Sequence, residues 1–172
     1  MISVREARPG DAEAIAAIYA HHVLHGTASF EEEPPSVEAW RDKIGTLASR
    51  RWPFIVAHDG DDVLGYAYAT QFRDRPAYAF TCENSIYIHP ERLGQGIGRH
   101  LLERLIEAAH EAGFRQMIGV IGGGEPASVA LHRACGFVDA GRMKSVGFKF
   151  GKWLDTVYVQ RELGSESGNV DE

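Results

Sequence analysis

The sequence predicts a single α/β domain built on one mixed β-sheet. Short segments with apolar residues at every second position, typical of strands, alternate with segments whose apolar residues recur every three or four positions, typical of helices. In chain order these segments give β-α-α-β-β-β-α-β-α-β, with a hairpin near the middle. No internal repeat or linker divides the 172 residues, a length that suits one domain with a real core.

The first half of the chain is expected to supply one strand, two helices and the hairpin. Asp11 and Ser36 stand where side chains cap helix starts, and Asp59-Gly60 is a turn pair. The polar connector at 27–35 carries one conspicuous aromatic, Phe30. The expected elements are a strand at 2–7, a helix at 12–26, a helix from Ser36 through Leu47, and a hairpin at 53–72.

The second half is expected to alternate strands and helices after a charged loop at 73–76. Gly136 closes the second of these helices. The last residues, 164–172, are polar and rich in glycine and serine, so we expect a disordered tail after a domain spanning 1–163. The expected elements are a strand at 77–90, a helix from Gly98 to Ala109 with an apolar stripe, a strand at 116–121, a helix at 128–135 and a strand at 154–163.

Composition and charge exclude several classes of protein. The formal net charge is −6, whereas a general nucleic-acid binder needs a basic surface. No stretch is long and apolar enough to span a membrane, and the first residues lack the apolar core of a secretory signal. Two cysteines, Cys82 and Cys135, are too few for a disulfide framework. We therefore expect a cytoplasmic protein without nucleic-acid or membrane partners.

Three glycines at alternating positions, Gly94, Gly96 and Gly98, run directly into a helix. A P-loop would need Lys and Ser or Thr after the last glycine, but Arg99 and His100 follow it. A dinucleotide fingerprint would need a different glycine spacing in an N-terminal βαβ unit. The remaining interpretation is a loop whose backbone N–H groups, from Gly94 to Arg99, hold a diphosphate without a metal. A helix start with no ligand is the alternative.

The glycine loop and the segments around it resemble those of a known enzyme family. The stretch "GQGIGRHLLERLIEAA", preceded by "SIYIHP" and followed by "ALHRACGF", resembles the acetyl-CoA-binding core of the GNAT N-acetyltransferases. The stretches "RDRPAYAFTCENSIYIHP" and "VGFKFGKWLDTVYVQREL" resemble, more narrowly, the phosphinothricin and methionine sulfone/sulfoximine acetyltransferases. The resemblance covers nearly the whole chain. It implies the GNAT fold, a central mixed, twisted sheet flanked by helices, and direct acetyl transfer in a ternary complex.

The resemblance also implies where acetyl-CoA binds. Leu93 stands where the superfamily usually has Arg or Gln, and Glu125 where this family often has Asn. The backbone N–H groups of the strand before the loop would stabilise the oxyanion. The implied cofactor-binding residues are Ile86, Tyr87, Ile88, Gly94, Gln95, Gly96, Ile97, Gly98, Arg99, Glu125 and Ser128.

Amide formation from an amine and a thioester needs a base for the ammonium and a proton for the departing thiolate. The resemblance places the general base at Glu83, acting directly or through a water, and the general acid at His132. Arg73 and Arg75 each offer a planar fork for a carboxylate or phosphinate. Lys149 would lie near the site or at a dimer seam. The expected substrate-binding residues are Phe30, Arg73, Asp74, Arg75, Tyr78, Glu83, Asn84, Ser85 and Lys149.

The acceptor would be the α-amine of a small amino-acid analogue such as phosphinothricin, methionine sulfone or methionine sulfoximine. Alternatives are another amine (a protein N-terminus, a lysine or an aminoglycoside) and a non-catalytic acyl-CoA-binding module. A structural or oligomerisation domain would not need the glycine loop. We expect a homodimer that uses no metal, since His21 and His25 have zinc-ligand spacing on a helix but no third ligand motif accompanies them.

Overall fold

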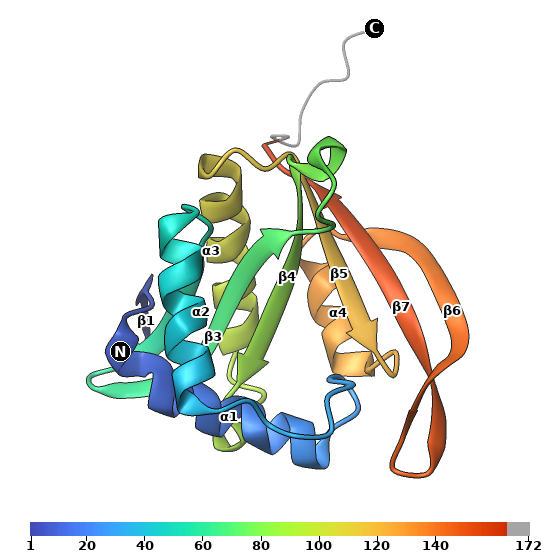
Figure 1. The fold of residues 1–172 in the computed structure, drawn as a ribbon, viewed down its shortest axis with the longest axis horizontal. Coiled ribbons are helices and arrows are strands. Elements are labelled where there is room, and N and C mark those ends of the chain that lie inside the picture. The colour runs from blue at the N-terminus through green and yellow to red at the C-terminus, as the bar shows by residue number, and fades with distance from the viewer. Residues whose placement is uncertain (165–172) are drawn as a thin grey trace, which may run out of the picture.

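The computed structural model describes residues 1–164, so the expected disordered tail lies, apart from Gly164, outside the described residues. A seven-stranded sheet in the order β1-β2-β3-β4-β5-β7-β6 forms the centre (Figure 1). Neighbouring strands are antiparallel except β4 and β5, which are parallel. The strands are β1 Ser3–Glu6, β2 Phe54–Asp59, β3 Asp62–Gln71, β4 Thr81–Ile88, β5 Gln116–Gly122, β6 Val138–Lys149 and β7 Lys152–Glu162.

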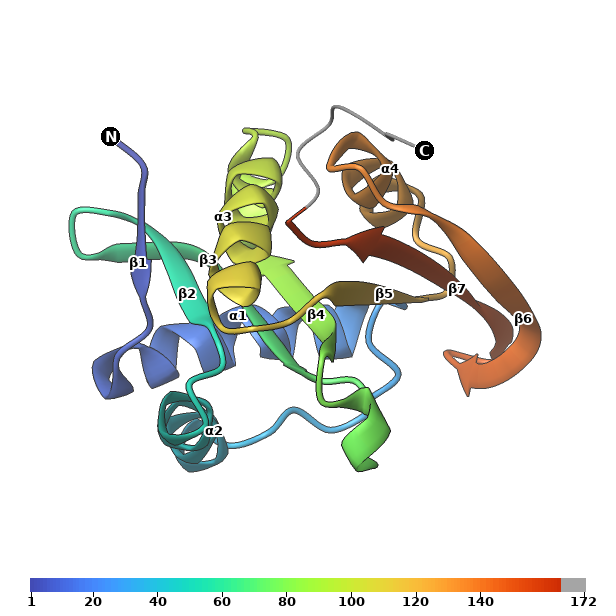
Figure 2. The ribbon, with the colours of Figure 1, turned by 90° about the horizontal axis from the view of Figure 1, so that it is seen from above.

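Four helices cover the two faces of this sheet, two on each (Figure 2). They are α1 Ala12–His25, α2 Val37–Ser49, α3 Ile97–Glu111 and α4 Pro126–Ala134. The stripe predicted for the third helix is confirmed, because the five residues that form it are buried, namely Leu101, Leu102, Leu105, Ile106 and Ala109. No helix within residues 1–164 has the length and apolar character needed to cross a membrane.

Each face of the sheet has its own core, and strand alternation assigns every side chain of β4 to one of them. Cys82 belongs to the core beneath α3, while Tyr87 packs against the aromatic core beneath α1 and α2. Consecutive residues of β4 therefore face different helices. Glu83 lies on the α1/α2 face, and Asn84 lies on the α3/α4 face.

The central feature for function is an opening between β4 and β5. The two strands pair from Thr81↔Gln116 to Asn84↔Gly119 and then diverge, as Figure 1 shows. Beyond Asn84, the backbone of Ser85–Ile88 keeps its pairing with β3 on one side only. Apart from the Ile88 carbonyl oxygen, which contacts His22, the backbone groups that point into the opening are thus left free for another partner.

Three sequence predictions need correction. The strand expected at 154–163 has an antiparallel partner, β6, which was missed because it is an almost wholly exposed edge strand with irregular register and Ser145 at φ +53°. The strand expected from residue 77 begins at Thr81, after a 3₁₀ turn at Pro76–Tyr78.

The third correction concerns helix caps. The Asp11 carboxylate accepts hydrogen bonds from the Arg8 backbone N–H at 2.7 Å and from the Arg5 guanidinium at 2.8 and 2.9 Å. It therefore closes the turn before α1 rather than capping the helix itself. The Ser36 cap is confirmed, since its Oγ accepts from the backbone N–H of Ala39 at 3.1 Å.

Candidate active site

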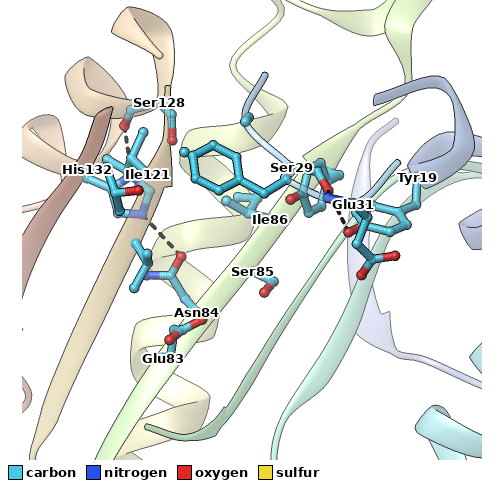
Figure 3. Close-up of a pocket in the computed structure, with 16 residues that line it drawn as sticks. Tyr19, Ser29, Glu31, Glu83, Asn84, Ser85, Ile86, Ile121, Ser128 and His132 are labelled. Atoms are coloured by element: carbon cyan, nitrogen blue, oxygen red, sulfur yellow. Dashed lines mark hydrogen bonds between the residues drawn. The ribbon is translucent and has the colours of Figure 1, made fainter. Parts of the chain in front are cut away.

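A cavity of about 490 Å³ lies where β4 and β5 part. It is lined by both strands, by α4 and by the connector between α1 and α2 (Figure 3). Polar groups converge on it from opposite sides, with Tyr19, Ser29 and Glu31 at one end and His132 and Asn84 at the other. The residues that line it are Tyr19, Ala28, Ser29, Phe30, Glu31, Glu83, Asn84, Ser85, Ile86, Tyr87, Val120, Ile121, Gly122, Ser128, His132 and Thr156.

Glu83 lines this cavity from the middle of β4. Its side chain is 34% exposed, and its Oε1 lies 3.8 Å from Nη1 of Arg73. Burial raises the pKa of the Glu83 carboxyl above its ordinary value of 4.5, while the charges of Arg73 and Lys43 hold the pKa down in part. A carboxylate with a raised pKa binds a proton more readily, which suits a general base.

His132 reaches the same cavity from α4, and the residue is 2% exposed. Its Nδ1 lies 2.7 Å from the Ser128 carbonyl oxygen, and its Nε2 lies 3.1 Å from Oδ1 of Asn84. Burial lowers the pKa of the imidazole below its ordinary value of 6.5. A Cβ at Gly119 of β5 would lie only 3.0 Å from the His132 ring, so the absence of a side chain there lets the imidazole lie against the strand.

The glycine loop leads from the end of β4 into α3. Gly94 and Gly96 have φ of +72° and +78°, a conformation that side chains other than glycine rarely adopt. Gly96 occupies the N-cap position of α3 without any side-chain cap. The first N–H groups of a 15-residue helix therefore face outward with no side-chain partner, as a diphosphate site requires.

Comparison with known proteins identifies the family. Residues 15–137 match the model of the acetyltransferase (GNAT) family, which covers the opening, the glycine loop and His132. The chain belongs to the GNAT acetyltransferases. Its predicted fold class is thereby confirmed.

Two curated GNAT relatives match nearly the whole chain. A phosphinothricin N-acetyltransferase of Alcaligenes faecalis is 50% identical over 99% of this chain and 87% of its own. An L-methionine sulfoximine/L-methionine sulfone acetyltransferase of Pseudomonas aeruginosa is 39% identical over 94% of each chain. The crystal structure of a phosphinothricin acetyltransferase from Sinorhizobium meliloti in complex with AcCoA superimposes with a TM-score of 0.93, at 47% identity over 96% of this chain and 90% of that one.

In this GNAT domain, Asn84 lies on the opposite face of β4 from Glu83 and contacts His132, and its predicted substrate contact stays a prediction. Its Nδ2 also lies 3.5 Å from the Ile118 carbonyl oxygen. Ser128 O and Asn84 Oδ1 both accept, so both contacts are hydrogen bonds only when each ring nitrogen carries a proton, the form that burial disfavours. Turning the Asn84 amide by 180° would present Nδ2 to a neutral ring instead, but it would give up the contact of Nδ2 with Ile118. The orientation of the Asn84 amide is thus linked to the protonation state of His132.

The remaining predicted site residues fall into two groups. Those that line the cavity are Phe30, Glu83, Asn84, Ser85, Ile86, Tyr87, Ser128 and His132. The exposed loop beside Glu83 holds the second group, in which Arg73 alone approaches the cavity, through its contact with Glu83. Arg73 also stacks on Phe72, whose ring contacts Tyr78 on its edge. Asp74, Arg75 and Tyr78 lie outside the cavity walls, and their predicted substrate contacts stay predictions.

Glu125 has a local partner within α4. Its carboxylate accepts a hydrogen bond from the backbone N–H of Ser128 at 2.7 Å and so caps the helix that carries His132. In the glycine loop, the Arg99 guanidinium donates to Glu103 at 2.9 Å. Both side chains thus have partners within the chain, Arg99 at the surface, and their cofactor contacts remain predictions.

Lys149 is buried behind the cavity wall, with 3% of its surface exposed. Its ammonium donates to the carbonyl oxygens of Val23 at 2.7 Å, Gly26 at 3.0 Å and Ser29 at 2.7 Å. All three donors of the ammonium are therefore used by the end of α1 and the connector that follows it. Lys149 supports the wall that carries Ser29 and Phe30, which is a different role from the substrate contact expected of it.

Replacing Lys149 by methionine is expected to destabilise the fold by roughly 3 kcal/mol, because it leaves three carbonyl groups without their charged donor. Thermal unfolding measures the loss. Lys152, its exposed partner across the β6–β7 turn, provides the control, since Lys152→Met should leave the midpoint nearly unchanged. Equal midpoints for the two variants would contradict the supporting role of Lys149.

Several cavity residues were not predicted from the sequence. Tyr19 comes from the predicted helix at 12–26, and Glu31 from an acidic run that is mostly exposed. Val120, Ile121 and Thr156 come from strands that read simply as core. These residues are far apart in the sequence and meet only in the folded protein, around the β4–β5 opening, so no local sequence pattern identifies them. Phe30 was found because an aromatic residue in a polar connector is unusual.

Within the described residues 1–164, no group of three or more His, Cys, Asp or Glu could hold a metal ion. The rings of His21 and His25 lie 4.9 Å apart on α1, as their spacing predicts. Their neighbour His22 has the structural contact, with Nε2 2.7 Å from the Ile88 carbonyl oxygen at the end of β4.

Proposed function

We propose that the protein transfers the acetyl group of acetyl-CoA to the α-amine of a small amino-acid analogue of the phosphinothricin, methionine sulfone or methionine sulfoximine type. One observation carries the proposal. A carboxylate with a raised pKa, Glu83, and a buried imidazole, His132, reach one cavity from opposite faces of the same sheet. The acceptors named for the relatives described above supply the substrate class.

The residues present fit acetyl-CoA. The uncapped N-terminus of α3 with its glycine loop would hold the diphosphate. The backbone of Ile86 and the N–H of Ile88, which face the opening, would pair with the amide groups of the pantetheine arm. When bound, acetyl-CoA supplies an activated acetyl thioester. No metal takes part in this scheme, and the Gly94–Arg99 loop provides the anion site.

Two side chains move the protons. Glu83 accepts a proton from the acceptor's ammonium, directly or through a water, and leaves a neutral amine to attack. The nitrogen of the tetrahedral intermediate then loses a second proton to water as the amide forms. A backbone N–H among residues 86–88 stabilises the oxygen that gains negative charge. His132 supplies a proton to the departing sulfur, and Asn84 positions the ring through its contact with Nε2. Transfer is direct, without an acyl-enzyme.

A thiol-release assay tests this proposal. Acetyl-CoA is offered with phosphinothricin, methionine sulfone, methionine sulfoximine, an alanine-ended peptide and an aminoglycoside. We expect turnover with the first three. Turnover with only the peptide or only the aminoglycoside would contradict the proposed acceptor class but would still support an acetyltransferase activity. Acetyl-CoA binding with no turnover of any amine would favour a regulatory module.

The glycine loop leads to a separate prediction about the binding of acetyl-CoA. Gly96→Val is expected to weaken acetyl-CoA binding about tenfold or more, since a β-branched residue at φ +78° costs on the order of 1–3 kcal/mol and reorients the first N–H groups of α3. Isothermal calorimetry measures the dissociation constant. Gly45→Ala, in the open middle of α2, is the control and should bind normally. If Gly96→Val bound acetyl-CoA with unchanged affinity, the glycine loop would not be part of the acetyl-CoA site.

The expected homodimer belongs to this proposal, with β6 and β7 as its contact surface. Their hairpin exposes large apolar side chains, namely Met143, Val146, Phe148, Phe150 and Trp153. An edge strand with such a face favours pairing with a second copy. Sedimentation should give a dimer for the native chain and a monomer for the double variant Phe148→Lys/Trp153→Lys. A monomeric native chain would rule this surface out as a dimer contact.

We place the enzyme in the cytoplasm. Cys82 and Cys135 are both free and buried, which suits a reducing compartment.

A further inference from the structure

A second, smaller cavity of about 260 Å³ adjoins the active-site cavity. Both cavities use Tyr19 and Glu31 as walls. The smaller one is otherwise enclosed mainly by Trp40 and Lys43 of α2 and by Tyr68 of β3. We call it the side cavity.

The side cavity lies on the same face of the sheet as Glu83. Tyr68 is the direct cross-strand partner of Ser85, and Thr70 is the partner of Glu83. Directly paired residues of neighbouring strands project to the same face, so Tyr68 and Glu83 both point toward α1 and α2. A molecule whose amine is at Glu83 would have to extend past Ser85 on this face to reach the side cavity.

Lys43 gives the side cavity its polar character. Its ammonium donates to the Tyr68 hydroxyl at 2.9 Å and lies 4.3 Å from the centre of the Tyr68 ring and 5.4 Å from that of Trp40. Among residues 1–164, no carboxylate lies within 4 Å of it. An ammonium has three donors, and the described residues engage one of them.

The walls are aromatic and the donor is charged, so the side cavity suits a group that combines apolar and oxygen-bearing parts. Tyr19, Trp40 and Tyr68 would contact methyl and methylene groups, and Lys43 would donate to oxygens on sulfur or phosphorus. Glu31 is a wall of both cavities, and its carboxylate repels an anionic group in the side cavity, so the charge of Lys43 has to offset this repulsion. With Lys43 as the donor, an amino acid would lie with its side chain toward Lys43 and its amine toward Glu83.

We infer that the side cavity is the subsite for the acceptor's side chain, and that Lys43 recognises its phosphinate, sulfone or sulfoximine oxygens. The inference rests on the acceptor class proposed above. It makes Lys43 a determinant of acceptor choice, separate from the groups that move protons.

The test compares acceptors of different charge in one variant. Lys43→Met keeps the aliphatic stem and removes the donors. We expect kcat/KM to fall on the order of 10- to 100-fold for phosphinothricin, whose phosphinate is anionic, and by less than 10-fold for the neutral methionine sulfone. Lys43→Arg should restore most of the phosphinothricin activity. Acetyl-CoA affinity should be unchanged in both variants.

The opposing role for Lys43 is electrostatic, because its charge also lowers the pKa of Glu83. If that were its only role, kcat/KM would fall by the same factor for both acceptors, and that equal loss would overturn the inference. Tyr68→Phe gives a second check, since removing the hydroxyl partner of Lys43 should lower the phosphinothricin-to-sulfone ratio in the same direction. Failure of the native enzyme to turn over either acceptor would instead contradict the proposed function.

Discussion

Replacing Glu83 by glutamine is expected to lower kcat by roughly 10²- to 10⁴-fold, the range that general base catalysis contributes. Glutamine keeps the size of the side chain and its place on β4 but cannot accept the proton of the acceptor's ammonium. Acetyl-CoA binding should stay within about twofold of native, because the donor loop lies at the other end of the opening. Steady-state kinetics and calorimetry measure the two effects, and an unchanged kcat would remove Glu83 from the mechanism.

The pH dependence of kcat provides a control for this assignment. The base must be ionised, so kcat should rise with pH along a limb whose midpoint lies above 4.5, the ordinary pKa of the carboxyl. The charge of Arg73 holds that pKa down. Arg73→Gln should therefore move the midpoint further up, while Glu83→Gln should abolish the limb. If Arg73→Gln left the midpoint of the pH profile unchanged, the rising limb would belong to a group other than Glu83.

Replacing His132 by alanine is expected to lower kcat by about 10²-fold through loss of the proton donor. The same change opens a cavity beneath α4 and should cost roughly 2 kcal/mol of stability. The two effects are separated by Phe137→Leu, because the Phe137 ring packs 4.9 Å from the imidazole and is equally buried. That control should lower the unfolding midpoint and leave kcat close to native. If His132→Ala and Phe137→Leu had equal kcat, His132 would have only a packing role.

The general fold was predictable because its signals are local. The Asp59-Gly60 turn between β2 and β3, the stripe of α3 and the Ser36 cap each operate over a few residues. The strand β6 gave no such signal, because both of its faces are largely exposed and alternation needs one buried face. The end of the 3₁₀ turn at Pro76–Tyr78 was absorbed into the expected strand because the aromatic residues Tyr78 and Phe80 favour extended structure.

The site was only partly predictable, for a physical reason. Glu83 and His132 stand within recognisable motifs, and both line the cavity. The roles of Asn84 and Lys149 depend on contacts across 48 and more than 100 residues, which no spacing rule reports. Lys149 in particular looks like a surface cation in the sequence, and only the return of β6 against the end of α1 buries it.

The alternation of β4 has a consequence for how this enzyme can change. Glu83 and Asn84 are adjacent in the chain, yet the sheet separates the helices that each of them faces. Substitutions on α2 and the connector after α1 reach the amine to be modified, while those on α3 and α4 reach the acyl donor. A lineage can thus acquire a new amine by varying one layer of the molecule while the other layer continues to serve the same donor.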